Sequence, residues 1–101
     1  MIEEVALFVT DIGAAAMARQ MGSHVTRTAP RSLVPTADRA LGLGGQLESY
    51  LAGKSLQFEN VPDMSDAEWK QFLDGRFPGQ TWSRWFGKTP SAIYSVVVVE
   101  S

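Results

Sequence analysis

Residues 76 to 88 interleave three cations with four aromatic side chains and contain no acid. Side chains of these types bind without covalent chemistry: aromatic rings stack on nucleobases or sugar rings, while cations follow phosphates. Trp and Arg are also enriched in the hot spots of protein interfaces. If the rings are buried instead, the stretch is a corner of the core whose cations reach back to water. The candidate binding residues are Arg76, Trp82, Arg84, Trp85, Phe86 and Lys88.

A second candidate site is Gly53-Lys54-Ser55, which matches the end of a phosphate-binding loop. In that motif backbone amides surround the phosphates and the lysine reaches their outer oxygen atoms. The motif needs a glycine where this chain has Glu48, and a strand where the pattern here predicts a helix. We therefore interpret these residues as the end of a helix followed by the polar start of a strand.

His24 is the only histidine, so it is the natural candidate for a general base, with Asp11 and Ser23 nearby in the sequence. A catalytic triad needs a base within hydrogen-bond reach of a nucleophile, and no spacing here indicates one. Asp63, Asp66, Glu68 and Asp74 could form a carboxylate pair or a divalent-cation site, but Asp66 and Glu68 are explained as first-turn helix acids, and the spacing lacks the dense oxygen ligands of a calcium loop. We therefore expect a protein that is not an enzyme and that needs no cofactor and no metal.

The composition predicts one globular domain over residues 1–101, since 45% of the residues are hydrophobic and 20% are charged. The absence of cysteine excludes disulfides and thiolate chemistry. The acidic start, Met-Ile-Glu-Glu, lacks the basic flank of a signal peptide, and no apolar run approaches the length of a membrane span. We therefore expect a soluble, cytoplasmic protein with no membrane partner.

The elements that must position the candidate residues begin with a helix over 66–74. Ser65 and Glu68 have the spacing of a capping box, in which the two residues satisfy each other's free backbone amides. Met64 and Trp69 complete a hydrophobic staple, and Gly75 is the expected left-handed end.

The candidate residues themselves follow a turn at Phe77-Pro78-Gly79. Thr81 is a possible cap for a single helical turn ending at Gly87. The i, i+3, i+4 spacing would then place Trp82, Trp85 and Phe86 on one face. We expect most aromatic rings of the chain to be buried, with Trp82 or Trp85 facing outwards, because a small domain must fill its core.

Residues 92–99 form a β-branched run whose two alternating faces are both mostly apolar. Such a strand must be covered on both faces, and on an exposed edge it would pair with other chains. It is therefore either central in the sheet or completed by a partner, which makes a homo-oligomer through strand 92–99 one possibility.

The remaining pattern predicts strands at 5–10 and 55–60, a short strand at 24–28, and helices at 12–21 and 46–52. Thr36 could begin the latter helix after a loop from Pro30 to Pro35, but glycines at 42, 44 and 45 favour a start near Gln46. The fold class is α+β, a small domain with a short, mainly antiparallel sheet and two to three helices packed on it.

The stretch Val-Ala-Leu-Phe-Val-Thr-Asp-Ile-Gly-Ala-Ala at 5–15 is similar to the first strand and helix of vicinal-oxygen-chelate domains. That resemblance implies metal ligands at His and Glu positions. With a single histidine, nothing in this chain maps onto that ligand pattern, and we assign no family from the sequence.

Three functions compete. The first is a non-catalytic protein-interaction module (an adaptor, inhibitor or assembly subunit) that binds another protein, or itself, through the aromatic and basic surface. The second is a nucleic-acid-binding protein that adds Arg19, Arg27 and Arg31 to those cations, which the net charge of −2 disfavours. The third is a small-molecule-binding domain or enzyme with an aromatic-lined pocket near His24. We rank them in this order.

Overall fold

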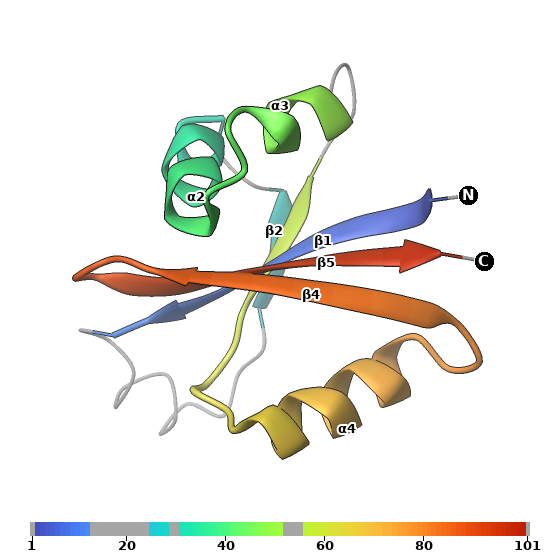
Figure 1. The fold of residues 1–101 in the computed structure, drawn as a ribbon. Coiled ribbons are helices and arrows are strands. Elements are labelled where there is room, and N and C mark those ends of the chain that lie inside the picture. Colours follow the sequence, from blue (N-terminus) through green and yellow to red (C-terminus); the bar gives the residue numbers. More distant parts are fainter. Residues whose placement is uncertain (1, 13–24, 29–30, 52–55, 101) are drawn as a thin grey trace.

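A sheet of five strands runs through the molecule (Figure 1). Its strands are β1 (Ile2–Asp11), β2 (Val25–Thr28), β3 (Gln57–Asn60), β4 (Thr81–Lys88) and β5 (Ala92–Glu100), in the order β2-β3-β1-β5-β4. The computed structural model describes residues 2–12, 25–28, 31–51 and 56–100. β1 is parallel to β3, and the other three neighbouring pairs are antiparallel. The predicted α+β class with a mainly antiparallel sheet is confirmed.

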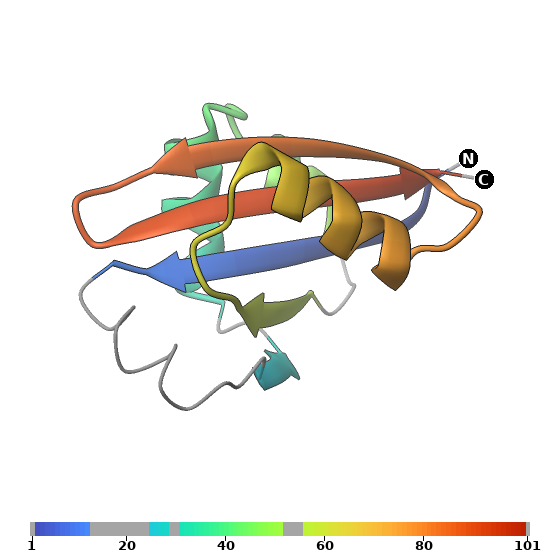
Figure 2. The same cartoon turned by 90° about the horizontal axis from the view of Figure 1, so that it is seen from below.

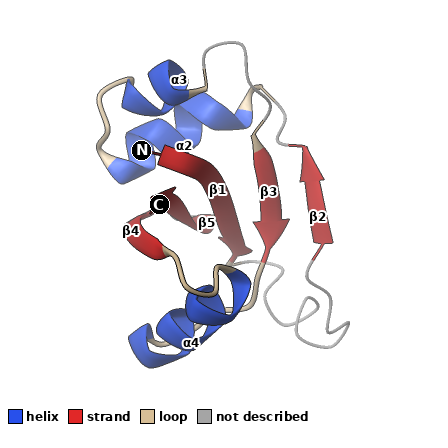
Figure 3. Ribbon diagram, turned by 90° about the vertical axis from the view of Figure 1, so that its right-hand side faces the viewer, coloured by secondary structure: helices blue, strands red, loops and turns tan. Residues whose placement is uncertain are grey.

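Helices cover both faces of this sheet. α2 (Leu33–Leu41) and α3 (Gln46–Tyr50) lie on one face, and α4 (Asp66–Arg76) lies on the other (Figure 3). The helices predicted at 46–52 and 66–74 correspond to α3 and α4. None of the described helices is long and apolar enough to cross a membrane.

β5 is an interior strand of the sheet and contributes side chains to both hydrophobic cores. It pairs with β1 along one edge and with β4 along the other, so the prediction of a central strand is confirmed. Both of its edges are thereby occupied within the chain, and the alternative, a homo-oligomer formed by pairing of strand 92–99, has no free edge to use. That alternative was wrong because β4, predicted as a helical turn, supplies the missing neighbour.

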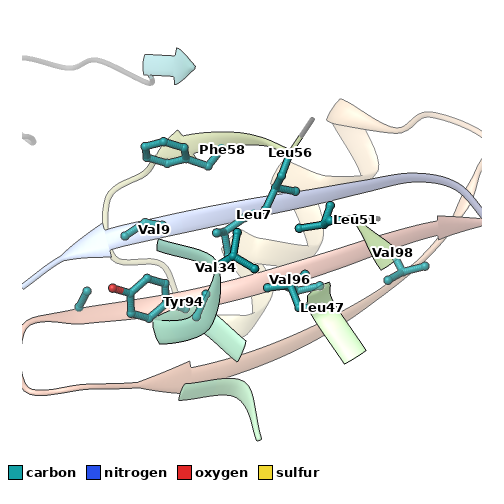
Figure 4. Packing of buried hydrophobic residues seen from close by; sticks show 12 residues of the cluster. Leu7, Val9, Val34, Leu47, Leu51, Leu56, Phe58, Tyr94, Val96 and Val98 are labelled. Atoms are coloured by element: carbon teal, nitrogen blue, oxygen red, sulfur yellow. The ribbon is translucent and has the colours of Figure 1, made fainter. Parts of the chain in front are cut away.

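The side chains of β5 alternate between two separate cores, as the period of a strand requires. Val96 and Val98 join the core beneath α2 and α3, whereas Val97 and Val99 join the core beneath α4. Figure 4 shows the first core, in which Leu47 of α3 and Leu51, just after α3, approach β1 and β5. In Figure 2, α4 lies across the opposite face. The second core consists of Phe8, Val61, Trp69, Leu73, Phe77, Val97 and Val99.

The start of α4 forms as predicted. The Glu68 amide donates to Ser65 Oγ at 3.2 Å, and the Ser65 amide donates to Glu68 Oε1 at 3.0 Å. Hydrogen bonds to the Glu68 carboxyl, first from the Ser65 backbone amide and then from the Ser65 side chain, lower its pKa. The end of α4 differs from the prediction, because Gly75 is inside the helix without a left-handed backbone and the helix runs on to Arg76.

The α2–α3 pair departs from the prediction at its start. Residues 33–35, predicted as loop, are helical, and Thr36 is inside α2 and not its cap. Pro35 is tolerated because the first turn of a helix leaves its amides without helical partners. The glycines form the link between the helices, as the alternative start near Gln46 required. The carboxylate of Asp38 accepts from the Gly45 amide at 2.8 Å and the Leu47 amide at 3.0 Å, which fixes α3 on α2.

Several predictions concern residues that the structure does not describe. The helix predicted at 12–21 falls outside the described residues except for Ile12, and so do His24, Arg19 and the Gly53-Lys54-Ser55 stretch. The short strand predicted at 24–28 is present as β2, at residues 25–28.

Candidate interaction surface

Residues 81–88 form strand β4 and not the predicted helical turn. Each residue from Thr81 to Lys88 pairs with a residue of β5, from Glu100 to Ile93. The helical interpretation failed because aromatic residues also favour strands, and only the presence of β5 decides which backbone partners are available. The strand period of two places Trp85 and Phe86 on opposite faces of the sheet, which a helix would have placed together.

A tight turn at residues 89–92 holds β4 against β5. The Thr89 amide donates to the Ala92 carbonyl at 2.8 Å, and Thr89 Oγ1 accepts from the amides of Ser91 at 3.3 Å and Ala92 at 3.1 Å. A threonine hydroxyl that accepts from the following amides stabilises a turn locally. This role of Thr89 was not predicted, although a threonine before Pro90-Ser91 is a signal for it.

Arg84 is held against α4 on one face of β4. Its guanidinium carbon lies 4.3 Å from the centroid of the Trp69 ring and 4.7 Å from that of Phe86. Its Nε donates to Ser95 Oγ at 3.2 Å, and Nη1 lies 3.9 Å from Asp66 Oδ1. Burial lowers the pKa of Arg84, and the Asp66 carboxylate opposes that shift. Arg84 therefore closes the core beneath α4, and it is not a free cation on the surface.

Trp82 is attached to the same helix. Its indole Nε1 donates to Asp74 Oδ1 at 2.8 Å, and Lys70 Nζ contacts Asp74 Oδ2 at 2.7 Å. The hydrogen bonds from Lys70 and from Trp82, in that order, lower the pKa of the Asp74 carboxyl. The Trp82 side chain is half-buried, and its hydrogen bond to Asp74 connects β4 to α4.

Arg76, at the end of α4, makes an ion pair with Glu59 of β3. Arg76 Nη2 lies 2.5 Å from Glu59 Oε1, and the Glu59 side chain is 2% exposed. The guanidinium also lies over the rings of Phe72, at 5.3 Å, and Phe8, at 5.9 Å. Residues 55–60 alternate polar and apolar side chains, a pattern typical of a half-exposed strand, yet Glu59 is buried. It is buried because Arg76, 17 positions away, balances its charge, and no local pattern reveals that pairing.

Two large side chains of β4 remain exposed. Trp85 is 47% exposed and Phe86 is 64% exposed, which makes Phe86 the more exposed of the two. Lys88, at the end of the strand, is also exposed. Of the six candidate residues, the structure thus joins Trp82, Arg84 and Arg76 to the α4 side of the domain. It leaves Trp85, Phe86 and Lys88 accessible along β4.

Two open hollows among the described residues lie away from this stretch. One of about 310 Å³ is lined by residues 2–5 with Tyr50, Leu51 and Gln57. Another of about 480 Å³ lies beside the α2–α3 link, at Pro35, Asp38 and Glu48. Neither is lined by an aromatic residue of the 76–88 stretch. In the part of the chain that the structure describes, no three His, Asp or Glu side chains are grouped to hold a metal ion.

Comparison of the chain with protein-family models, with curated protein sequences and with solved structures gave no match.

Proposed function

We propose that the chain is a non-catalytic protein-interaction module that binds a polypeptide along β4. The observation that carries the proposal is the position of β4 at the end of the sheet, with β5 as its only neighbour among the described strands. An edge strand offers unpaired backbone amides and carbonyls to an incoming strand. Trp85 and Phe86 flank that edge on the two faces and are exposed.

Such a surface supports strand addition. In that mode the backbone hydrogen bonds supply affinity, and side chains on either face supply specificity. Exposed aromatic side chains add large apolar contact area, which is why they are frequent among binding hot spots. An adaptor, an inhibitor and an assembly subunit would all use the edge in this way.

The charges of the surface favour a polypeptide over a nucleic acid. Two of the three cations in the stretch, Arg76 and Arg84, already face the carboxylates of Glu59 and Asp66. Binding to a phosphate backbone depends on several accessible cations. Of the three cations, only Lys88 has no acid within ion-pair distance among the described residues. One accessible cation is not enough to bind a phosphate backbone.

Photo-crosslinking tests the proposal. A benzophenone side chain would replace Ser83, which is exposed on β4, or Gln71, which is exposed on α4 and serves as the matched control. We expect covalent adducts with a polypeptide from position 83 and far fewer from position 71, analysed by mass spectrometry after irradiation in cells. Equal yields from the two positions, or no polypeptide adduct from position 83, would contradict the proposal.

A further inference from the structure

The hydrogen-bonding phase of β4 determines which backbone groups face outwards. In an antiparallel pair, alternate residues direct their amide and carbonyl groups to the partner strand, and the residues between them direct theirs away. The Thr89 amide donates to the Ala92 carbonyl in the hairpin. Every second residue before Thr89, at 87, 85, 83 and 81, therefore directs its amide and carbonyl towards β5. The outward groups therefore belong to Trp82, Arg84, Phe86 and Lys88.

The other edge of β5 agrees with this phase. The Ile12 amide donates to the Ser91 carbonyl at 3.0 Å, which places residues 93, 95 and 97 in the hydrogen-bonded phase towards β1. Even-numbered residues of β5 are left to bond with β4, as the hairpin requires. Two independent contacts thus assign the same four outward residues.

We propose that a second copy of this chain occupies the free edge, with the two β4 strands antiparallel and Trp85 opposite its own counterpart. This inference rests on the proposed function, because it identifies the partner of the same surface. The two sheets would join into one continuous sheet through a two-fold axis at Trp85. A two-fold interface of this kind uses the same patch on both copies.

Self-pairing in this register matches every outward residue with an outward residue. Arg84 lies opposite Phe86, and Lys88 lies opposite Trp82, on the α4 face of the sheet. Each cation is therefore paired with an aromatic ring, a combination that is attractive across strands. On the other face, Trp85 pairs with Trp85, and aromatic cross-strand pairs are among the most favourable.

Neighbouring registers are less favourable because they oppose like charges. A shift by two residues in one direction places Arg84 opposite Arg84. The same shift in the other direction places Arg84 opposite Lys88. Like charges directly across a strand pair are destabilising, and each shift also leaves outward amides unpaired. The register centred on Trp85 is thus both the one with the greatest overlap and the one without charge conflict.

Apart from the exposed Lys88 at its end, the edge of β4 lacks the usual features that prevent pairing. Natural edge strands are protected by shortness, bulges, proline or exposed charge. β4 has eight residues, pairs with β5 without a register shift, and its proline, Pro90, lies beyond it in the turn. The Arg84 side chain is only 14% exposed, because α4 holds it inwards. By contrast β2, the other edge, has four residues.

The α2 face of β4 also suits a second copy. Ser83 would lie opposite Gly87, and Thr81 opposite Thr89, so small side chains surround the central tryptophan pair. An added Cβ at Gly87 would be 1.7 Å from the Ala40 carbonyl oxygen, so α2 crowds this end of the strand. A small residue opposite Gly87 is what that crowding requires.

A cysteine cross-link tests the register, because the natural chain has no cysteine. Trp85→Cys would place two Cα atoms about 4.5 Å apart in a non-hydrogen-bonded pair, within disulfide reach. Ser83→Cys is the matched control, since its counterpart would lie roughly 13 Å further along the strand. We expect mild oxidation to give a disulfide dimer from the full chain with Trp85→Cys and not from Ser83→Cys. Equal cross-linking of the two variants, or preferential cross-linking of Ser83→Cys, would overturn the register.

The second measurement is the dimer dissociation constant by analytical ultracentrifugation, for the natural chain, Phe86→Pro and Phe86→Thr. Proline removes the outward amide of residue 86, which β5 does not use, whereas threonine keeps that amide and removes only the ring. We expect Phe86→Pro to weaken dimerisation by at least about tenfold relative to Phe86→Thr. Circular dichroism of both variants verifies that the sheet is retained.

The outcomes separate this inference from the proposed function. A chain that remains monomeric up to roughly 1 mM, or a dimer unaffected by Phe86→Pro, overturns the second copy as the occupant. If position 83 then still cross-links to a different polypeptide, the proposed function stands with another partner. If position 83 yields no polypeptide adduct of any kind, the proposed function itself fails.

Discussion

β4 and β5 are consecutive strands of one hairpin, yet their surroundings are opposite. Seven of the nine residues of β5 are buried, whereas β4 has no buried residue, although it carries two tryptophans and a phenylalanine. β5 has a strand on each side and helices over both faces, whereas β4 has one neighbouring strand. The position of a strand in the sheet, and not hydrophobicity alone, therefore decides whether its aromatic side chains are buried or exposed.

The side-chain types reflect that difference. β5 is filled by valines, which pack well on a pleated surface that is covered on both sides. On its α4 face β4 alternates aromatic and cationic side chains, at 82, 84, 86 and 88, whose apolar stems and rings cover the edge of the core while part of each remains accessible. Gly87 differs from the other residues of β4, because α2 approaches the strand there and leaves no room for a side chain.

A substitution at Gly87 should destabilise the protein most. Gly87→Ala places a Cβ 1.7 Å from the Ala40 carbonyl oxygen and 2.3 Å from its carbon, and a backbone cannot move aside as a side chain can. We expect a loss of about 3 kcal/mol in the free energy of unfolding, measured by urea denaturation. Gly75→Ala, at a glycine with open space around it, is the control and should not destabilise the protein. A neutral Gly87→Ala would mean that α2 and β4 do not pack as described.

A smaller expected effect sharpens the comparison between the strands. Val97 is fully buried, so Val97→Ala should lower the free energy of unfolding by about 2 to 3 kcal/mol through lost burial and a cavity. Phe86→Thr, at the most exposed aromatic position of β4, should cost about 1 kcal/mol or less. Both are measured at low protein concentration, because a dimer would add a concentration-dependent term. Similar losses for the two variants would remove the distinction between the strands.

The smallest expected effect concerns pH and the helix that supports both strands. The pKa of Glu68 is lowered in the folded state, so its contribution is present above the ordinary value of 4.5 and is lost as pH falls through the lowered pKa. We therefore expect Glu68→Gln to destabilise the protein at neutral pH and to differ less from the natural chain at about pH 3. Asp63→Asn, two residues before the cap, controls for removal of a charge. A difference between Glu68→Gln and the natural chain that does not change with pH would exclude this role.

Features of the fold that depend on residues close together in the sequence were easier to predict than features that depend on distant residues. The start of α4 was predicted to the residue because the capping contacts join residues three apart. The doubly apolar pattern of residues 92–99 predicted that both faces of this strand are covered, and it left a central place and a partner chain as the two alternatives. In contrast, the start of α2 was missed because prolines at both ends of residues 30–35 suggested a loop, although a first helical turn also accepts proline.

The candidate site was predicted in composition and not in arrangement. The six residues were selected by type, and the expectation that Trp85 faces outwards is consistent with its exposure. Trp82 is half-buried, however, and the shared aromatic face does not exist, because a strand separates neighbouring side chains that a helix would group. The partners of Arg76 and Arg84 could not be predicted, since both acids lie in other elements.

Four properties follow from the amino-acid sequence alone: the α+β class, the cap of α4, the buried character of residues 92–99 and the concentration of aromatic and basic residues at 76–88. These properties depend on composition and on contacts within a few residues. Only the tertiary structure decided that β4 is a strand at the edge, that Glu59 balances Arg76, and that Trp85 and Phe86 flank a free edge. Those features depend on which distant segment supplies the neighbouring backbone, and a local pattern does not encode that choice.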